Sequence, residues 1–189
     1  MRLFIAINLP EKIKDNIVEA VQKLKENYFE ERFILRENWH LTICFLGYQA
    51  EGTFTGILKS IKETAAEFPA PEIELEKIIL APPERKVKTM VWIKGSQRTS
   101  EILGRLQKIL EKKLVENKIH FKIDSYEFNA HLTLVRFQNH FVNPSPLEFS
   151  DFQPLVFKAE TLDLMESHLK RSGAEYEILS RFAFKPSIL

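Results

Sequence analysis

The sequence has a single cysteine, almost no net charge and no long hydrophobic run, and each shortage excludes a class of protein. Cys44 cannot form an internal disulfide, which favours a reducing cytoplasmic location. The net charge of +1 gives no general affinity for nucleic acid. No segment approaches the roughly 20 apolar residues that span a bilayer, and the apolar N-terminal run is too short for a signal peptide. The composition therefore predicts one globular domain, or two small lobes that share a core.

The tripeptide His-x-Thr, in contrast, occurs twice, each time at the start of a predicted apolar strand. His40 and Thr42 form the first copy, and His131 and Thr133 form the second. Because side chains alternate along a strand, each histidine shares one face with its threonine. Two such strands would place two imidazoles and two hydroxyls around one cleft. A neutral imidazole can accept a proton while a protonated one donates, and the hydroxyls can bind phosphoryl oxygens, so the pattern favours metal-free cleavage of a phosphodiester.

The order of predicted elements also repeats. A strand over residues 2–9, a helix that begins at Pro10-Glu11 and the His40 strand are followed later by an equivalent series. That series has a strand over 90–93, a helix capped near Ser100 with Ile102, Leu106, Ile109 and Leu114 on its apolar stripe, and the His131 strand. The internal repeat spans about 2–47 and 89–137, which predicts a duplicated fold in a single bilobal domain over 1–189.

The remaining segments complete an α/β (α+β) fold. The pattern predicts a helix over 53–68, a half-exposed strand over 72–80, a proline-spaced loop over 143–154, and late strands over 155–167 and 176–184. We therefore expect two largely antiparallel sheets, helices outside them and a central cleft.

The motifs and their flanking residues resemble the two signatures of the 2H phosphoesterase superfamily. Phe45-Leu46-Gly47 follow the first motif, and Arg136 follows the second. Within the superfamily, the chain resembles the RNA 2′,3′-cyclic phosphodiesterases of bacteria and archaea, also called 2′-5′ RNA ligases. The resemblance extends over nearly the whole chain and includes the opening run 2–7, Trp39 and the late run from Ser167 to Tyr176.

The resemblance implies a bilobal fold and hydrolysis of a ribose 2′,3′-cyclic phosphate to a 2′-phosphomonoester, with no metal and no cofactor. It also implies reversible 2′-5′ joining of RNA. By analogy, His40 is the proton donor, His131 is the proton acceptor, and Thr42 and Thr133 hold the phosphoryl oxygens. The near-symmetry of the motifs leaves the two histidine roles interchangeable. The expected partners are RNA ends or nucleotides that carry a cyclic phosphate, bound by a monomer.

Three residues near the motifs have two readings each. Regular alternation places Cys44 on the His40 face, where it would be a nucleophile, although a small buried thiol is the commoner case. The same alternation places Arg136 on the face opposite His131, where it would be structural, unless the strand end turns it into the cleft to bind phosphate. Phe45, together with Trp39, either stacks on a base or packs against the core.

Other interpretations also stay open at this point. A zinc site would need more ligands at short spacing than the sequence offers, and His120, His140 and His168 are expected at the surface. The basic stretch 85–88 is either an RNA contact or a solvated turn. The alternative function is an RNA-end binding module on the same fold with little turnover, although a pure binder needs no matched acid and base.

Overall fold

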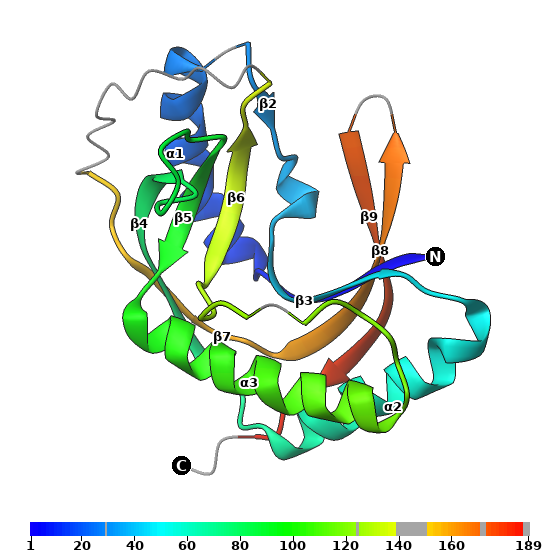
Figure 1. The fold of residues 1–189 in the computed structure, drawn as a ribbon. Coiled ribbons are helices and arrows are strands. Elements are labelled where there is room, and N and C mark those ends of the chain that lie inside the picture. The colour runs from blue at the N-terminus through cyan, green and yellow to red at the C-terminus, as the bar shows by residue number, and fades with distance from the viewer. Residues whose placement is uncertain (29, 124, 139–150, 171–172, 187–189) are drawn as a thin grey trace.

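The structure is a computed structural model that describes residues 1–28, 30–123, 125–138, 151–170 and 173–186. Its nine strands form one curled sheet, with the helices outside it (Figure 1). In chain order the elements are β1 (Arg2–Asn8), α1 (Glu11–Asn27), β2 (Arg32–Phe33), η1 (Arg36–Asn38), β3 (His40–Tyr48), η2 (Glu51–Thr53), α2 (Phe54–Glu67), β4 (Glu72–Ala81), β5 (Met90–Gly95), α3 (Gln97–Glu116), β6 (His131–Arg136), β7 (Leu155–Lys158), β8 (Thr161–Lys170) and β9 (Gly173–Ala183).

The sheet has two halves that meet at the two motif strands. Its order is β7-β4-β5-β6 and then β3-β1-β8-β9, and the short β2 pairs with β6. Each named strand pair is antiparallel. The two predicted sheets correspond to these halves, and the pairing of Leu41 with Leu132 joins them into one sheet. The predicted mixed α/β class is confirmed, and both His-x-Thr motifs lie at the centre of the sheet.

The helices bury their apolar stripes against the sheet, as their spacing predicts. In α1 the buried positions are Ile13, Ile17, Val21 and Leu24, and in α2 they include Ile57, Ile61 and Ala65. Burial of each such leucine, isoleucine or valine contributes roughly 1.5–3 kcal/mol. The helices thus lie on the outer side of the curled sheet (Figure 1).

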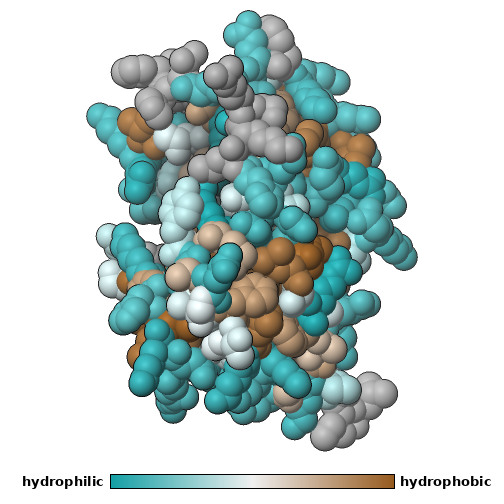
Figure 2. All heavy atoms as spheres, turned by 90° about the vertical axis from the view of Figure 1, so that its right-hand side faces the viewer, coloured by the Kyte–Doolittle hydropathy of each residue, from teal (hydrophilic) through white to brown (hydrophobic). Residues whose placement is uncertain are grey.

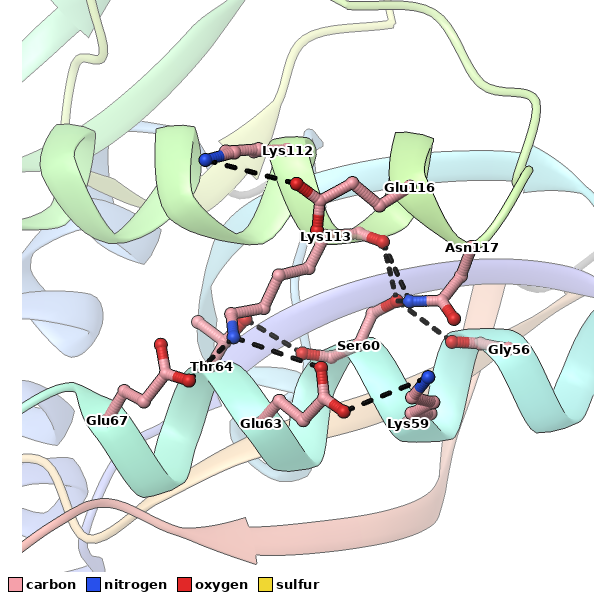
Figure 3. A network of polar contacts seen from close by, with 10 residues as sticks. All are labelled: Gly56, Lys59, Ser60, Glu63, Thr64, Glu67, Lys112, Lys113, Glu116 and Asn117. Atoms are coloured by element: carbon pink, nitrogen blue, oxygen red, sulfur yellow. Dashed lines mark hydrogen bonds and ion pairs between the residues drawn. The ribbon is translucent and has the colours of Figure 1, made fainter.

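A polar network joins the last turn of α3 to α2 (Figure 3). The fully buried Ser60 hydroxyl donates to the Gly56 carbonyl at 2.8 Å, and the Asn117 amide donates to the Ser60 hydroxyl at 3.1 Å. The Lys113 ammonium lies 2.8 Å from a Glu67 carboxylate oxygen. Because these bonds satisfy buried polar atoms at the end of α3, the two outer helices are fixed to each other.

The predicted start of one helix and part of its predicted apolar stripe are wrong. Helix α3 begins at Gln97 rather than near Ser100, because the Ser96 hydroxyl caps it by accepting from the Thr99 amide at 3.2 Å. Ile109, predicted on the apolar stripe, lies at the edge of the packed face and is 38% exposed. The buried stripe of α3 consists instead of Leu103, Leu106, Leu110 and Leu114.

The predicted late strand over 155–167 is two strands. β7 pairs with β4 at the edge of one half, whereas β8 pairs with β1 in the other half. The chain therefore crosses between the two halves at residues 159 and 160, which separates the strands. The strand predicted over 176–184 is confirmed as β9, which begins earlier, at Gly173. Residues 143–150 of the predicted loop lie outside the described residues.

Candidate active site

A cavity of about 430 Å³ lies where the two halves of the sheet meet. Both motifs contribute to its wall, through His40 and Thr42 of β3 and His131 and Thr133 of β6. Each leucine between a histidine and its threonine is 1% exposed and belongs to the core on the opposite face. Strands β3 and β6 are antiparallel and pair at Leu41 and Leu132. The two motifs therefore line the same cavity, with their strands running in opposite directions.

Each motif strand contains a β-bulge at the same place. On β1, Ile5 and Ala6 are neighbours, but their partners on β3 are Cys44 and Thr42, so β3 has one extra residue there. The equivalent register shift lies between Val91 and Trp92 of β5, whose partners on β6 are Val135 and Thr133. A bulge sets two residues against one and reverses the alternation of side chains beyond it.

The bulges explain why regular alternation predicts the wrong face of the sheet for two residues, Cys44 and Arg136. Cys44 is 4% exposed and belongs to the hydrophobic core, so the predicted position on the His40 face is wrong. Arg136 lines the cavity with His131, so the predicted position on the opposite face is also wrong. Phe45 is the residue equivalent to Arg136 in the first motif, and it lines the cavity as well.

The two imidazoles are held in the same way. The Nδ1 atom of His40 lies 2.7 Å from the Asn38 carbonyl oxygen, and Nδ1 of His131 lies 2.7 Å from the Asn129 carbonyl oxygen. Because a carbonyl oxygen only accepts, Nδ1 carries the proton in both rings and donates it. In the neutral ring Nε2 is then the basic nitrogen. At His40 this atom accepts from the Thr42 hydroxyl at 3.1 Å.

Burial favours the neutral form of both histidines in the free protein. Burial is the largest cause and lowers the pKa of His40 to about 4, with further lowering by the charges of His131 and Arg136. Burial also lowers the pKa of His131, as does the charge of Arg136. The hydrogen bonds that the two rings donate to the Asn38 and Asn129 carbonyls raise the pKa values and oppose these effects without cancelling them. An anion in the cavity would favour the protonated forms again.

Aromatic rings fix the orientation of both imidazoles. Trp92 stacks on His131 with 3.7 Å between ring centroids and 17° between planes. Phe4 and Tyr176 each lie 5.0 Å from His40, and the ring of Tyr176 meets it edge-on. The sequence did not reveal these contacts, since all three residues come from other strands. Phe4 and Trp92 lie on strands that flank the motif strands, and Tyr176 lies on β9 further out, so these contacts depend on the order and register of the sheet.

The cavity wall is positively charged. Arg2, Arg32 and Arg136 line it, and among the described residues no aspartate or glutamate does. The Arg2 guanidinium lies 5.0 Å from the centre of the Phe45 ring. Phe45 is 46% exposed, so its ring is available to a ligand. Trp39, in contrast, is 2% exposed and donates to the Ile34 carbonyl at 3.0 Å, which makes it a packing residue.

The other histidines lie outside the cavity or outside the described residues. His120 is exposed, and His140 lies among the residues that are not described. His168 of β8 is exposed and lies 3.8 Å from Glu166 and 3.3 Å from Glu177.

The basic stretch near Arg85 closes a turn. The Lys88 ammonium donates to the carbonyl oxygens of Pro82 at 3.1 Å, Pro83 at 2.8 Å and Arg85 at 2.7 Å. None of these residues lines the cavity. These bonds support the reading of this stretch as a turn.

The surface beside β8 and β9 is mainly hydrophilic, with hydrophobic residues gathered near the middle of the view (Figure 2). No helix in the described part of the chain is long and apolar enough to cross a membrane.

Comparison with known proteins finds similar phosphoesterases. The family model of the LigT-like phosphoesterases matches residues 7–92, which include the first motif. An RNA 2′,3′-cyclic phosphodiesterase of Thermotoga maritima is 26% identical over 100% of this chain and 98% of its own length. One of Methanocaldococcus jannaschii is 28% identical over 96% of this chain and 100% of its own length. The chain is thus similar to the LigT-like phosphoesterases over residues 7–92, and to RNA 2′,3′-cyclic phosphodiesterases over nearly its whole length.

Solved structures share the fold of this chain over nearly its whole length. A protein of Thermus thermophilus superposes with a TM-score of 0.76 at 24% identity, with 100% of both chains covered. The LigT protein of E. coli in complex with 3′-AMP gives a TM-score of 0.73 at 22% identity, with 97% of both chains covered.

Proposed function

We propose that the protein hydrolyses the 2′,3′-cyclic phosphate of RNA ends or nucleotides to a 2′-phosphomonoester, without a metal ion. One observation carries the proposal. Two imidazoles, each with Nδ1 bonded to a backbone carbonyl, line one cavity together with a threonine from each motif. In-line displacement at phosphorus needs a base and an acid on opposite sides, and two histidines supply both.

In the proposed reaction, Nε2 of His131 takes a proton from a water molecule as the water oxygen attacks phosphorus. The bond between phosphorus and O3′ breaks, and Nε2 of His40 gives its proton to O3′. The lowered pKa of both histidines means that His40 must gain this proton when the substrate binds. The negative charge of the phosphate favours that protonation. Thr42 and Thr133 donate hydrogen bonds to the non-bridging oxygens.

The residues that follow the bulges hold the rest of the substrate in this proposal. Arg136 binds phosphate oxygens, and its closeness is supported by its effect on the pKa of both histidines. Phe45 stacks on a base. A 5′-hydroxyl that replaced the water molecule would form a 2′-5′ linkage by the same steps, as the reversible ligation activity requires.

The proposed architecture is one bilobal domain whose lobes arose by duplication over about 2–47 and 89–137. Each lobe supplies one histidine, one threonine and one strand of the cleft. In each half three further strands follow the motif strand outward: β5, β4 and β7 beside β6, and β1, β8 and β9 beside β3. A single chain thus carries the complete set of proposed catalytic groups, which fits a monomer.

The test is hydrolysis in the presence of EDTA. Purified protein is incubated with a 2′,3′-cyclic nucleotide and with an RNA that ends in one, and the 2′- and 3′-phosphate products are separated. We expect 2′-phosphate, a loss of about 10²–10⁴-fold in rate for His40→Ala or His131→Ala, and a loss of roughly 10²–10³-fold for Thr42→Val. The exposed His120→Ala variant is the matched control.

Each other outcome has a definite meaning. Binding of the cyclic end with no turnover would support the RNA-end binding module instead. A 3′-phosphate product would show that O2′ leaves rather than O3′, and inhibition by EDTA would overturn the metal-free mechanism.

A further inference from the structure

Two arginines face each other across the short pair of strands β2 and β6. The register places Arg32 of β2 directly opposite Arg136 of β6, and both side chains line the cavity. Like charges on directly opposite residues of a sheet repel each other and destabilise the pair. An anion between the two guanidinium groups would turn this repulsion into attraction.

Neither guanidinium has an acidic partner among the described residues. Within the described ranges Arg136 donates only to the Met90 sulfur at 3.3 Å, which is a weak acceptor, and Arg32 forms no ion pair there. Arg36, four residues after Arg32, shows the usual alternative. Its guanidinium lies 2.8 Å from Glu11 and 2.7 Å from Asp15. The Arg32–Arg136 pair therefore differs from an ordinary surface arginine in the same region.

The pair lies beyond the proposed catalytic groups along β6. Strand β3 occupies the edge of β6 at Leu132, and β2 takes over the same edge at Val135 and Arg136. The bulge adds a residue to β6 without lengthening the strand, so Arg136 lies only two ladder positions beyond Thr133. At about 3.3 Å per position, this is a distance of roughly 7 Å along the strand. That length is comparable to the separation of neighbouring phosphates along a nucleic acid strand.

The other end of the cavity has a different chemistry. Because β3 runs antiparallel to β6, Phe45 lies on the side of the motifs opposite to Arg136. The Phe45 end thus offers an aromatic ring with one guanidinium, that of Arg2, beside it, whereas the Arg136 end offers two guanidinium groups. A nucleotide bound with its base toward Phe45 would direct its remaining phosphate away from that end.

We propose that Arg32 and Arg136 form a second anion subsite, which takes the phosphate on the 5′ side of the nucleotide that carries the cyclic phosphate. Arg136 is shared with the reacting phosphate, whereas Arg32 serves the second phosphate. The proposal rests on the proposed function and specifies its substrate. The protein prefers cyclic ends that have a 5′ phosphate, as in an RNA chain, over nucleoside 2′,3′-cyclic phosphates.

The experiment compares two substrates that differ by one phosphate. These are adenosine 2′,3′-cyclic phosphate and the same molecule with a 5′-phosphate, and kcat/KM is measured for both. A charge-assisted hydrogen bond to phosphate corresponds to a preference of roughly 10–100-fold. We expect Arg32→Gln to lose most of this preference by lowering kcat/KM for the 5′-phosphorylated substrate alone. Arg32→Lys should recover part of it. Arg98→Gln, which removes an exposed charge from α3, is the matched control.

Equal kcat/KM for the two substrates in the unmodified protein would overturn the subsite. So would an equal loss on both substrates in Arg32→Gln, since it would indicate an effect on the shape of the cleft. If neither substrate is turned over, the proposed function fails first. Calorimetric titration with the same two molecules then tests the subsite by itself, through the ratio of their Kd values in the unmodified protein and in Arg32→Gln.

Discussion

The lowered pKa of His40 makes the stability of the fold depend on pH, and the size of this effect can be worked out. In the unfolded chain the pKa is about 6.5, and in the folded protein it is about 4. Below pH 6.5 the unfolded state therefore binds more protons, so stability falls as the pH drops from 6.5 toward 4. For a shift of this size the full loss is about 3 kcal/mol, and about 2 kcal/mol of it has occurred at pH 5. Because the ring borders an open cavity, we expect about 1–2 kcal/mol.

The assay is urea unfolding at pH 7, 6 and 5 for the unmodified protein and for His40→Asn. The variant lacks the titrating ring, so its free energy of unfolding should fall by about 1–2 kcal/mol less between pH 7 and pH 5. His131 is present in both proteins, so for this residue only the electrostatic coupling to His40 differs between them. His120→Asn, at an exposed position, should behave like the unmodified protein. An unchanged pH dependence in His40→Asn would refute the reasoning that burial holds this ring neutral.

Two further predictions concern the charge and the packing beside the motifs. Arg136→Gln should move the pH profile of kcat/KM to higher pH, since its charge lowers the pKa of both histidines, and an unmoved profile would show that the guanidinium lies too far away. Gly95→Ala should lower the free energy of unfolding in urea by about 1–3 kcal/mol, because its new Cβ would lie 2.9 Å from the Ala130 side chain and 3.1 Å from Thr99. Gly52→Ala, with nothing within 4 Å, is the control, and equal effects would contradict the packing argument.

The sequence predicted the parts of this fold that depend on local periodicity. The apolar stripe of α1 and the pairing of each histidine with its threonine on one face follow from spacing alone. Both motifs were therefore correctly placed on strands, and the two sheet halves around them were expected.

The positions after the bulges could not be predicted, because a bulge depends on the register with a neighbouring strand. Cys44 and Arg136 were misplaced for that one reason. The contact of Trp92 with His131 likewise depends on long-range pairing. Arg32 was missed because its strand has two residues, which is too short for any alternation to show.

In each motif strand the β-bulge also places one residue on the side of the cleft and outside the hydrophobic core. Phe45 and Arg136 are exposed toward the cleft, while the residues just before them, Cys44 and Val135, are buried. A substitution at either exposed position changes what the cleft presents to a ligand without replacing a residue of the hydrophobic core. Descendants of such a chain can therefore acquire a new ligand preference by one codon change at either end of the cleft, without first gaining stability elsewhere to compensate for a damaged core.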